Sequence, residues 1–181
     1  MALQASPLIF ICVADYATTR SLLSAPHVAA ALAGRTMIQL STGTPREARE
    51  MAAWAKDSGA DYLDGAIMAY VHMIGGPKAQ ILVAGEEEVF ARCRPYLACF
   101  ASDVRHVGEN AGAAEALDLA ILSEYLGQIA GTLHGLRLCE AEHMDADMFA
   151  SLYRNGHVVR ELAHLIHTAA PTNRVAPIQA R

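Results

Sequence analysis

Lysine is almost absent from this sequence, whose 181 residues include only Lys56 and Lys78. Charged residues of all kinds make up 18% of the chain, the formal net charge is −5 at pH 7, and no basic run occurs. A nucleic-acid surface needs clustered cations to neutralise phosphates, so this composition argues against a nucleic-acid partner. Residues 1–16 lack the basic start and the cleavage-type end of a secretion signal. We therefore expect a cytoplasmic protein.

Cysteine is also sparse and shows no organised spacing. The four cysteines form no CxxC pair and have no histidine at metal-ligand spacing. This pattern predicts reduced, buried thiols and no metal site. The cysteines are Cys12, Cys93, Cys99 and Cys139.

Hydrophobic residues make up 53% of the chain, which is enough for a sizeable core, and the length suits one domain, or one domain with an appendage. Short apolar runs alternate with helical segments over roughly the first hundred residues, a pattern typical of an α/β fold with a largely parallel sheet. Strands are predicted at residues 8–14, 36–40, 61–68, 80–84 and 104–107, and helices at 17–33 (broken at Pro26), 45–58 and 85–100.

The sequence around Thr44 carries a strong signal for the start of a helix. Thr44 is a good N-cap, Pro45 suits the first helical position, and Glu47 three residues after Thr44 completes a capping box. Gly59 is the predicted end of this helix.

A long helix is predicted from Gly108 to Glu140, with no proline and with apolar residues on nearly every side. This pattern predicts a buried helix, and 33 residues would span roughly 50 Å. Polar residues interrupt the apolar run, so we do not expect a membrane span. Gly127, Gly131 and Gly135 recur every fourth residue, which favours close contact with another helix at a dimer interface. A further helical stretch is predicted at 146–168, and a loose terminus from residue 170.

Asp118 breaks the apolar pattern of the long helix. Burying a carboxylate without a partner is costly, so Asp118 is either paired in the core or faces a cleft. The sequence leaves both readings open.

Three clusters lie at or just after the carboxyl ends of three successive predicted strands, at 13–15, 41–43 and 65–68. Ligands of parallel sheets bind beyond the carboxyl ends of the strands. These clusters are therefore candidate site residues, although each one alone is also compatible with an ordinary turn.

Five motifs in order resemble the β-hydroxyacid dehydrogenase (6-phosphogluconate dehydrogenase-like) superfamily and, within it, the imine reductases and reductive aminases. They are FICVADY, IQLSTGTPREA, ADYLDGAIMAY, MIGGPKAQILVAG and HVGENAGAAEALDLAIL. The resemblance implies a partial Rossmann-like NADPH-binding domain over residues 1–108. It also implies a long interdomain helix and a shortened helical domain over 109–181 that dimerises with a second copy.

The resemblance also implies roles for particular residues. Cys12, Val13, Ser41 and Thr42 would lie near the nicotinamide. The substrate pocket would include Gly65, Ile67, Met68 and Tyr125, although a packed role for Tyr125 is the simpler reading. Asp118 would be the catalytic residue.

Two features favour a C=N substrate over a C=O substrate. Similar hydroxyacid dehydrogenases carry a catalytic lysine early on the long helix, whereas this helix has none and places Asp118 there. The third strand also has the imine reductase form, with residues 64–68 reading DGAIM. A carboxylate stabilises an iminium cation, whereas a lysine would repel it. The expected substrates are a small-molecule imine, or a ketone together with an amine.

The glycine-rich turn GxGxxG that holds the cofactor pyrophosphate is absent from this sequence. By resemblance, we expect the chain to begin at the family's fourth strand, with the opening βαβ unit missing. Whether the chain is itself an enzyme stays open at this stage. The alternatives are a non-catalytic dimerising fragment without bound cofactor and an enzyme like the 3-hydroxyacid dehydrogenases.

Overall fold

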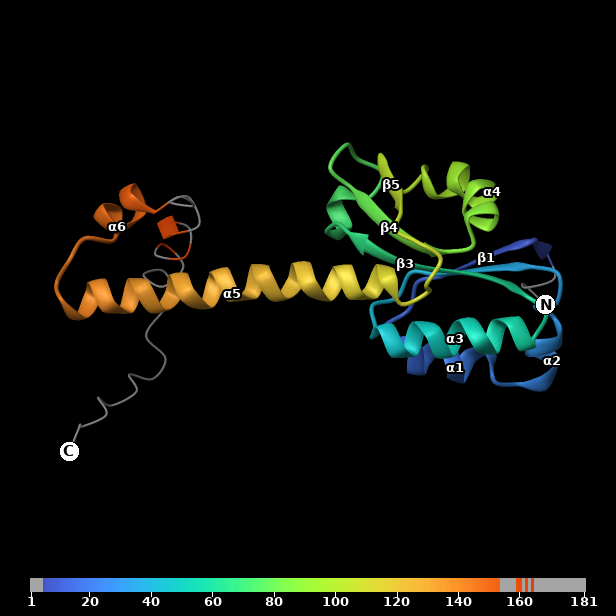
Figure 1. The fold of residues 1–181 in the computed structure, drawn as a ribbon. Coiled ribbons are helices and arrows are strands. Elements are labelled where there is room, and N and C mark those ends of the chain that lie inside the picture. The colour runs from blue at the N-terminus through green and yellow to red at the C-terminus, as the bar shows by residue number, and fades with distance from the viewer. Residues whose placement is uncertain (1–4, 154–158, 161, 163, 165–181) are drawn as a thin grey trace, which may run out of the picture. The chain divides into compact units, whose positions relative to one another are not determined.

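The computed structural model describes residues 5–153, 159, 160, 162 and 164. Its sheet has the strand order β1-β2-β3-β4-β5 (Figure 1). The strands are β1 (Leu8–Ile11), β2 (Thr36–Gln39), β3 (Asp61–Met68), β4 (Gln80–Gly85) and β5 (Asp103–His106). β1, β2 and β3 are mutually parallel, as the alternation of elements predicts.

One pairing in the sheet is antiparallel. β4 runs against β3 and is itself parallel to β5. The connection between β3 and β4 contains only a short 3-10 turn, Val71–Met73. A parallel pairing needs a longer crossover, usually through a helix, so this short connection reverses the chain.

Helices cover both faces of the sheet (Figure 1). On one face, α1 (Tyr16–Leu23) and α3 (Pro45–Asp57) enclose a core that includes Met37 and Met51. On the other face, α4 (Glu87–Leu97) packs over a core that includes Ile38 and Ile81. The predicted break at Pro26 is confirmed, because α2 (Pro26–Ala30) begins there as a separate helix.

The start of α3 is fixed by the predicted capping box. The Thr44 side chain accepts a hydrogen bond from the Glu47 backbone N–H (3.3 Å), and Glu47 accepts one from the Thr44 backbone N–H (2.9 Å). Gly59 follows the helix with a φ of +73°, a conformation that favours glycine. Residues adjacent to α3 in the sequence therefore determine both of its ends.

The described chain divides into two compact units, one reaching to Ile121 and the other beginning at Leu122. The long helix α5 (Ala113–Ala141) contributes its first turns to the first unit and its remainder to the second. In the second unit α6 (Ala146–Leu152) packs on α5, with Leu136 and Ala150 in a shared apolar cluster. Most of the helix predicted at 146–168 beyond Tyr153, and the terminus from residue 170, lie outside the described residues.

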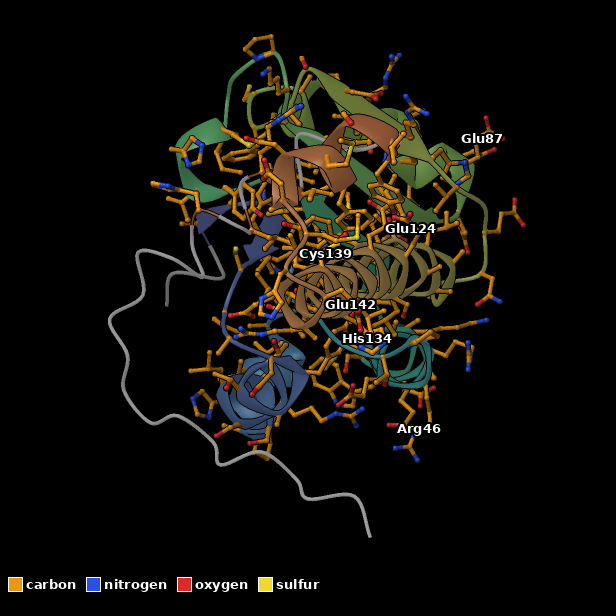
Figure 2. The ribbon with its side chains drawn as sticks, turned by 90° about the vertical axis from the view of Figure 1, so that its left-hand side faces the viewer. Arg46, Glu87, Glu124, His134, Cys139 and Glu142 are labelled. Carbon is orange, nitrogen blue, oxygen red and sulfur yellow. The ribbon has the colours of Figure 1, made fainter. Side chains whose placement is uncertain are left out.

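The expectation that α5 is buried on nearly every side is wrong for the single chain. Figure 2 looks along the axis of α5 and labels Glu124, His134 and Cys139 on it. Its exposed apolar residues include Leu117, Leu119, Ile121, Leu122, Leu126, Leu133 and Leu138. Within the described part of the chain, no helix is both long enough and apolar enough to cross a membrane.

The prediction of buried cysteines is correct only for Cys93. Cys12 and Cys99 are exposed and Cys139 is half-buried, because each lies in a connection or on an open helix face. All four are free thiols, as predicted.

Candidate functional site

The carboxyl ends of the three parallel strands lie level with one another. Ile11 of β1 is paired with Gln39 of β2, and Gln39 is paired with Asp64 of β3. The Val13 backbone N–H donates a hydrogen bond to Ser41 Oγ (2.9 Å), which ties the chain after β1 to the chain after β2. Two of the predicted cofactor residues therefore meet at this edge of the sheet.

The other two predicted cofactor residues lie at the same strand ends with exposed side chains, Cys12 after β1 and Thr42 after β2. An open apolar groove of about 510 Å³ runs beside β1 and is lined by Cys12, Val13, Phe10, Leu22 and Val28, among others. Beyond this groove, the described residues supply no strand to pair with the outer edge of β1.

The predicted pocket residues of β3 do not share one face of the sheet. Met68 packs with Ala113 and Ala114 at the head of α5. Ile67 packs into the core on the α4 side. A Cβ added at Gly65 would lie 3.0 Å from the Leu82 carbonyl oxygen, so close strand packing requires glycine there.

A buried carboxylate, Asp64, lies on the α1/α3 side of β3. Its Oδ1 accepts hydrogen bonds from the Tyr16 hydroxyl at the start of α1 and from the Tyr62 hydroxyl (3.0 Å for Tyr62). Its Oδ2 is fully buried and has no hydrogen-bond partner among the described residues. A buried ionised oxygen without a partner is costly, so this geometry favours the protonated acid.

The electrostatic surroundings of Asp64 also favour its protonated form. Burial is the main cause that raises the pKa of Asp64 to about 7, and the negative charge of Glu115 adds to the increase. The hydrogen bonds from Tyr16 and Tyr62 act in the opposite direction because they favour the ionised form. Burial also raises the pKa of both tyrosines, which therefore remain hydrogen-bond donors.

A second buried carboxylate, Glu115, comes from the first turn of α5. Its Oε2 accepts a hydrogen bond from the Gly43 backbone N–H (3.0 Å), which links the head of α5 to the turn after β2. Its Oε1 is buried without a hydrogen-bond partner in the described part of the chain. Burial raises the pKa of Glu115, and the neighbouring charge of Asp118 raises it further.

Asp118 lies one helical turn after Glu115 and is only 6% exposed. Burial raises its pKa, so its carboxyl group retains a proton to higher pH than an exposed aspartate does. Tyr125, the other polar residue predicted on this helix, belongs to the second unit and is 49% exposed.

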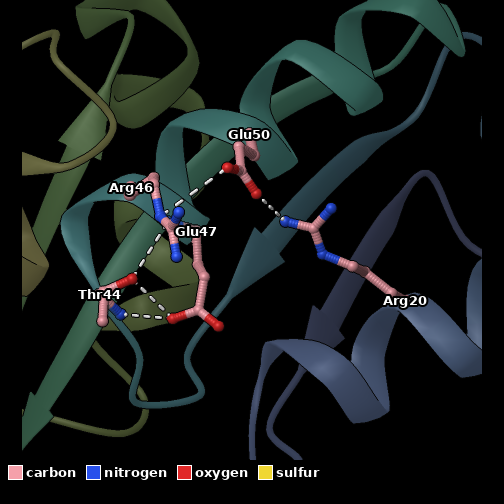
Figure 3. Close-up of polar contacts among 5 residues, drawn as sticks. All are labelled: Arg20, Thr44, Arg46, Glu47 and Glu50. Carbon is pink, nitrogen blue, oxygen red and sulfur yellow. Dashed lines mark hydrogen bonds and ion pairs between the residues drawn. The ribbon is translucent and has the colours of Figure 1, made fainter.

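Surface ion pairs join α1 to α3 beside this region (Figure 3). Arg20 on α1 contacts Glu50 on α3 (2.7 Å between Nη2 and Oε2), and Arg46 approaches the other oxygen of Glu50 (4.0 Å). All three side chains are well exposed, so these pairs contribute little to stability, ~0–1 kcal/mol. The buried carboxylates Asp64, Glu115 and Asp118 therefore say more about a functional site than these surface pairs do.

Sequence reasoning missed Tyr16, Tyr62 and Glu115 as part of this cluster. Tyr62 and Asp64 alternate along a strand and so share a face, and Glu115 stands three residues before Asp118 on a helix. These spacings are visible in the sequence, but only the tertiary structure brings Tyr16 to Asp64. In the part of the chain that the structure describes, no cluster of His, Cys, Asp or Glu side chains could hold a metal ion.

Comparison with known proteins identifies the family. Residues 1–108 match the model described as the NAD binding domain of 6-phosphogluconate dehydrogenase. The chain belongs to this family. The strand-end geometry described above is therefore that of a nucleotide-binding domain, and the nicotinamide cofactor class predicted from the sequence is confirmed for the family.

Three similar proteins narrow the relationship to one group. The NADPH-dependent reductive aminase of Aspergillus oryzae is 34% identical over 139 residues, covering 76% of this chain and 46% of the relative. The imine reductase of Myxococcus stipitatus, a variant in complex with NAD+, is 34% identical with a TM-score of 0.82, over 91% of this chain and 57% of that one. The reductive aminase of Aspergillus terreus, in complex with NADPH4, cyclohexanone and allyl amine, is 34% identical with a TM-score of 0.70, over 92% and 56%.

These findings confirm the resemblance to imine reductases and reductive aminases that the sequence motifs indicated. The chain spans about half the length of these relatives.

Proposed function

We propose that this chain forms part of an NADPH-dependent oxidoreductase of the imine reductase type, which transfers hydride to a C=N bond. The observation that carries the proposal is Asp118, a carboxylate almost fully buried near the head of a helix that contains no lysine. The 34% identity to an NADPH-dependent reductive aminase supports the same reaction class.

The chemistry assigned to Asp118 is that of a general acid. Burial raises the pKa of Asp118, which favours a carboxyl group that donates its proton to the imine nitrogen and leaves a carboxylate beside the iminium cation. NADPH, when bound, supplies the hydride and its electron pair to the iminium carbon. The apolar neighbours Met68 and Ala114 exclude water from the helix head on this side of the sheet.

The residues present fit the nicotinamide end of the cofactor. The strand ends are level and are tied together by the Val13–Ser41 hydrogen bond, which leaves Cys12 and Thr42 accessible at one edge. We assign Cys12, Val13, Ser41 and Thr42 to that end of the cofactor and Met68, which packs at the head of α5, to the substrate side. This sequence contains no GxGxxG turn for the pyrophosphate.

We also propose that two copies of the chain associate through α5. Exposed leucines at positions 119, 122, 126 and 133 are separated by three, four and seven residues, which places them on one face of α5 where two helices can pack along a seam. A helix with these side chains in water would lose exposed apolar surface on pairing.

The test of the proposed reaction is an NADPH titration of the 181-residue chain by calorimetry, with NADH in parallel and a cyclic imine added afterwards. We expect NADPH to bind and to be oxidised in the presence of the imine. Asp118→Asn should retain cofactor binding and lower the rate of imine reduction by about 100-fold or more, the usual contribution of a general acid. Glu124→Gln, an exposed carboxylate on the same helix, is the matched control.

Two outcomes would overturn this proposal. Unchanged imine reduction by Asp118→Asn would remove Asp118 from the chemistry. No binding at millimolar NADPH would favour the second reading, a dimerising fragment without cofactor, which the missing glycine-rich turn supports. Activity on 3-hydroxy acids in place of imines would favour the hydroxyacid dehydrogenase reading.

A further inference from the structure

The turn after β2, residues 41–43, is held by its neighbours while one of its side chains stays exposed. At its start, Ser41 Oγ accepts the Val13 backbone N–H (2.9 Å), and at its end Gly43 leads into α3. Thr42, between these two fixed residues, is exposed at the edge of the sheet. The position of Thr42 therefore depends on how firmly Ser41 and Gly43 are held.

Gly43 is contacted by side chains from two other elements. Its backbone N–H donates to Glu115 Oε2 (3.0 Å), and Glu115 comes from the first turn of α5, 72 residues later in the chain. The Tyr16 ring at the start of α1 occupies the space where a side chain at position 43 would lie, so a Cβ there would overlap the ring. Tyr16 is itself fully buried, and its hydroxyl donates to Asp64 Oδ1. Gly43 is therefore held by α1 and by α5 together.

The start of α5 also approaches the start of α3 at a second point. A Cβ added at Gly112 would lie 2.7 Å from the Pro45 carbonyl oxygen, so the two backbones approach as closely as glycine allows. This contact sets the distance between the two segments. The Glu115–Gly43 hydrogen bond adds direction, because a hydrogen bond weakens when the N–H and its acceptor are misaligned.

Glu115 does not need a negative charge to make this bond, since the carbonyl oxygen of a neutral carboxyl group also accepts an N–H. Burial raises its pKa, and its Oε1 is buried without a hydrogen-bond partner among the described residues, so both observations favour the neutral acid. An apolar side chain of similar size would suit a fully buried position at least as well for stability. The bond to Gly43 therefore explains a glutamate here better than stability does.

We propose that Glu115 is a positioning residue that fixes the turn carrying Thr42 relative to the helix head carrying Asp118. This inference rests on the proposed function, in which Thr42 lies at the nicotinamide and Asp118 gives the proton. These two residues belong to different elements, and the Glu115–Gly43 bond joins those elements directly. Because Glu115 is fully buried, it acts through Gly43. An offset of about 1 Å between reacting groups can lower a rate by ~100-fold, so a bond of this kind affects turnover.

The first measurement is the hydrogen exchange rate of the Gly43 amide by NMR, in the 181-residue chain without cofactor. Glu115→Leu keeps a buried helix-forming side chain but removes the acceptor. We expect exchange of this amide to become about 5- to 10-fold faster, the equivalent of one hydrogen bond. Glu115→Gln keeps an oxygen acceptor and should retain the wild-type rate. Glu124→Leu, which removes an exposed carboxylate from the same helix (Figure 2), should also retain it.

Steady-state imine reduction separates positioning from stability. We expect Glu115→Leu to lower kcat by about 10-fold or more with little change in KM for the imine, because the reacting groups are misplaced but still present. Glu115→Gln should restore kcat. A purely structural role predicts that kcat falls only as far as thermal stability falls. An unchanged kcat in folded Glu115→Leu, or an equal loss in Glu115→Gln, overturns the inference.

A second variant protects the test against a leucine substitution that does not fold. Glu115→Asp keeps the carboxyl group but shortens the side chain by one methylene group, so its oxygens no longer reach the Gly43 N–H. It should reproduce both the faster exchange of the Gly43 amide and the lower kcat. Wild-type exchange of that amide in either folded variant contradicts the assigned link.

The outcome is separable from that of the proposed function. Faster Gly43 exchange in Glu115→Leu together with full imine reduction by Asp118→Asn would keep the link between α5 and the turn and reject the reaction assigned to Asp118. Unchanged Gly43 exchange together with an inactive Asp118→Asn would keep the reaction and reject the role of Glu115.

Discussion

At the scale of single residues, the molecule is distinguished by carboxyl groups buried with incomplete hydrogen bonding. Asp64 has two tyrosine donors on one oxygen and no described partner on the other, and Glu115 repeats the pattern with the Gly43 N–H. A core that needed only stability would carry apolar residues at such positions. These groups therefore mark the region where the sequence departs from simple packing.

Asp64 makes the stability of the first unit depend on pH. Its pKa is raised from 3.8 to about 7, so the folded state binds a proton that the unfolded state has released. Its contribution is fully present below the unfolded pKa and is lost as pH rises through about 7. We expect the free energy of unfolding to fall between pH 5 and pH 8 by an amount on the order of 3 kcal/mol.

Urea denaturation of wild type and of Asp64→Asn across this pH range measures that dependence. The amide can still accept from both tyrosines and does not titrate, so most of the slope should disappear in the variant. A residual slope is expected because the pKa of Glu115 is raised as well. An equally steep slope in Asp64→Asn would contradict the assignment of the proton to Asp64.

At the scale of elements, the glycines of α5 have different surroundings although they share one spacing. A Cβ at Gly135 would lie 2.7 Å from the ring of Phe149 on α6, whereas Cβ atoms at Gly127 and Gly131 would meet nothing within 4 Å. Gly135 therefore serves contact between α5 and α6 within the chain. Gly127 and Gly131 remain available for the predicted contact with a second copy.

This difference predicts opposite effects of alanine substitution in the monomeric chain. Gly135→Ala should destabilise the second unit by about 1–3 kcal/mol, because the added methyl group displaces the Phe149 ring. Gly131→Ala should stabilise the helix by ~1 kcal/mol, since alanine is the better helix former. Chemical denaturation followed by circular dichroism, at concentrations below association, compares the two. Equal effects would contradict the assigned packing.

At the scale of the whole molecule, two exposed apolar surfaces of the described residues bear on self-association. One is the leucine stripe of α5, and the other is the groove beside β1, where Leu22 is 60% exposed. Open strand edges and apolar patches both favour association. The stripe is the longer and more regular of the two, so we assign the main self-association to it.

Sedimentation velocity tests that assignment. We expect the wild-type chain to sediment as a dimer or a larger species at micromolar concentration. Leu126→Glu places a charge in the middle of the α5 stripe and should shift the chain toward monomer, whereas Leu22→Glu beside β1 should leave the main species in place. A monomeric wild type, or dissociation only in Leu22→Glu, would contradict the assignment.

The order of helices and strands was predictable because the residues that start and end each element are close together in the sequence. The buried strands, the capping box at Thr44 and the end of α3 at Gly59 depend on side chains within a few residues of each other. The motifs also predicted the family, and they singled out Asp118 without settling whether it faces a partner or a cleft. The antiparallel direction of β4 was not predicted, because strand direction depends on how the connection packs.

The sequence by itself determined the strands, the helix caps, the family and the position of Asp118 on an otherwise apolar helix. Each of these features depends on residues that are close together in the sequence. Only the tertiary structure decided which polar groups meet. Tyr16 and Asp64 are 48 residues apart, and Gly43 and Glu115 are 72 apart. The pKa values that follow from these contacts depend on burial, and burial exists only once the sheet and α5 have packed together.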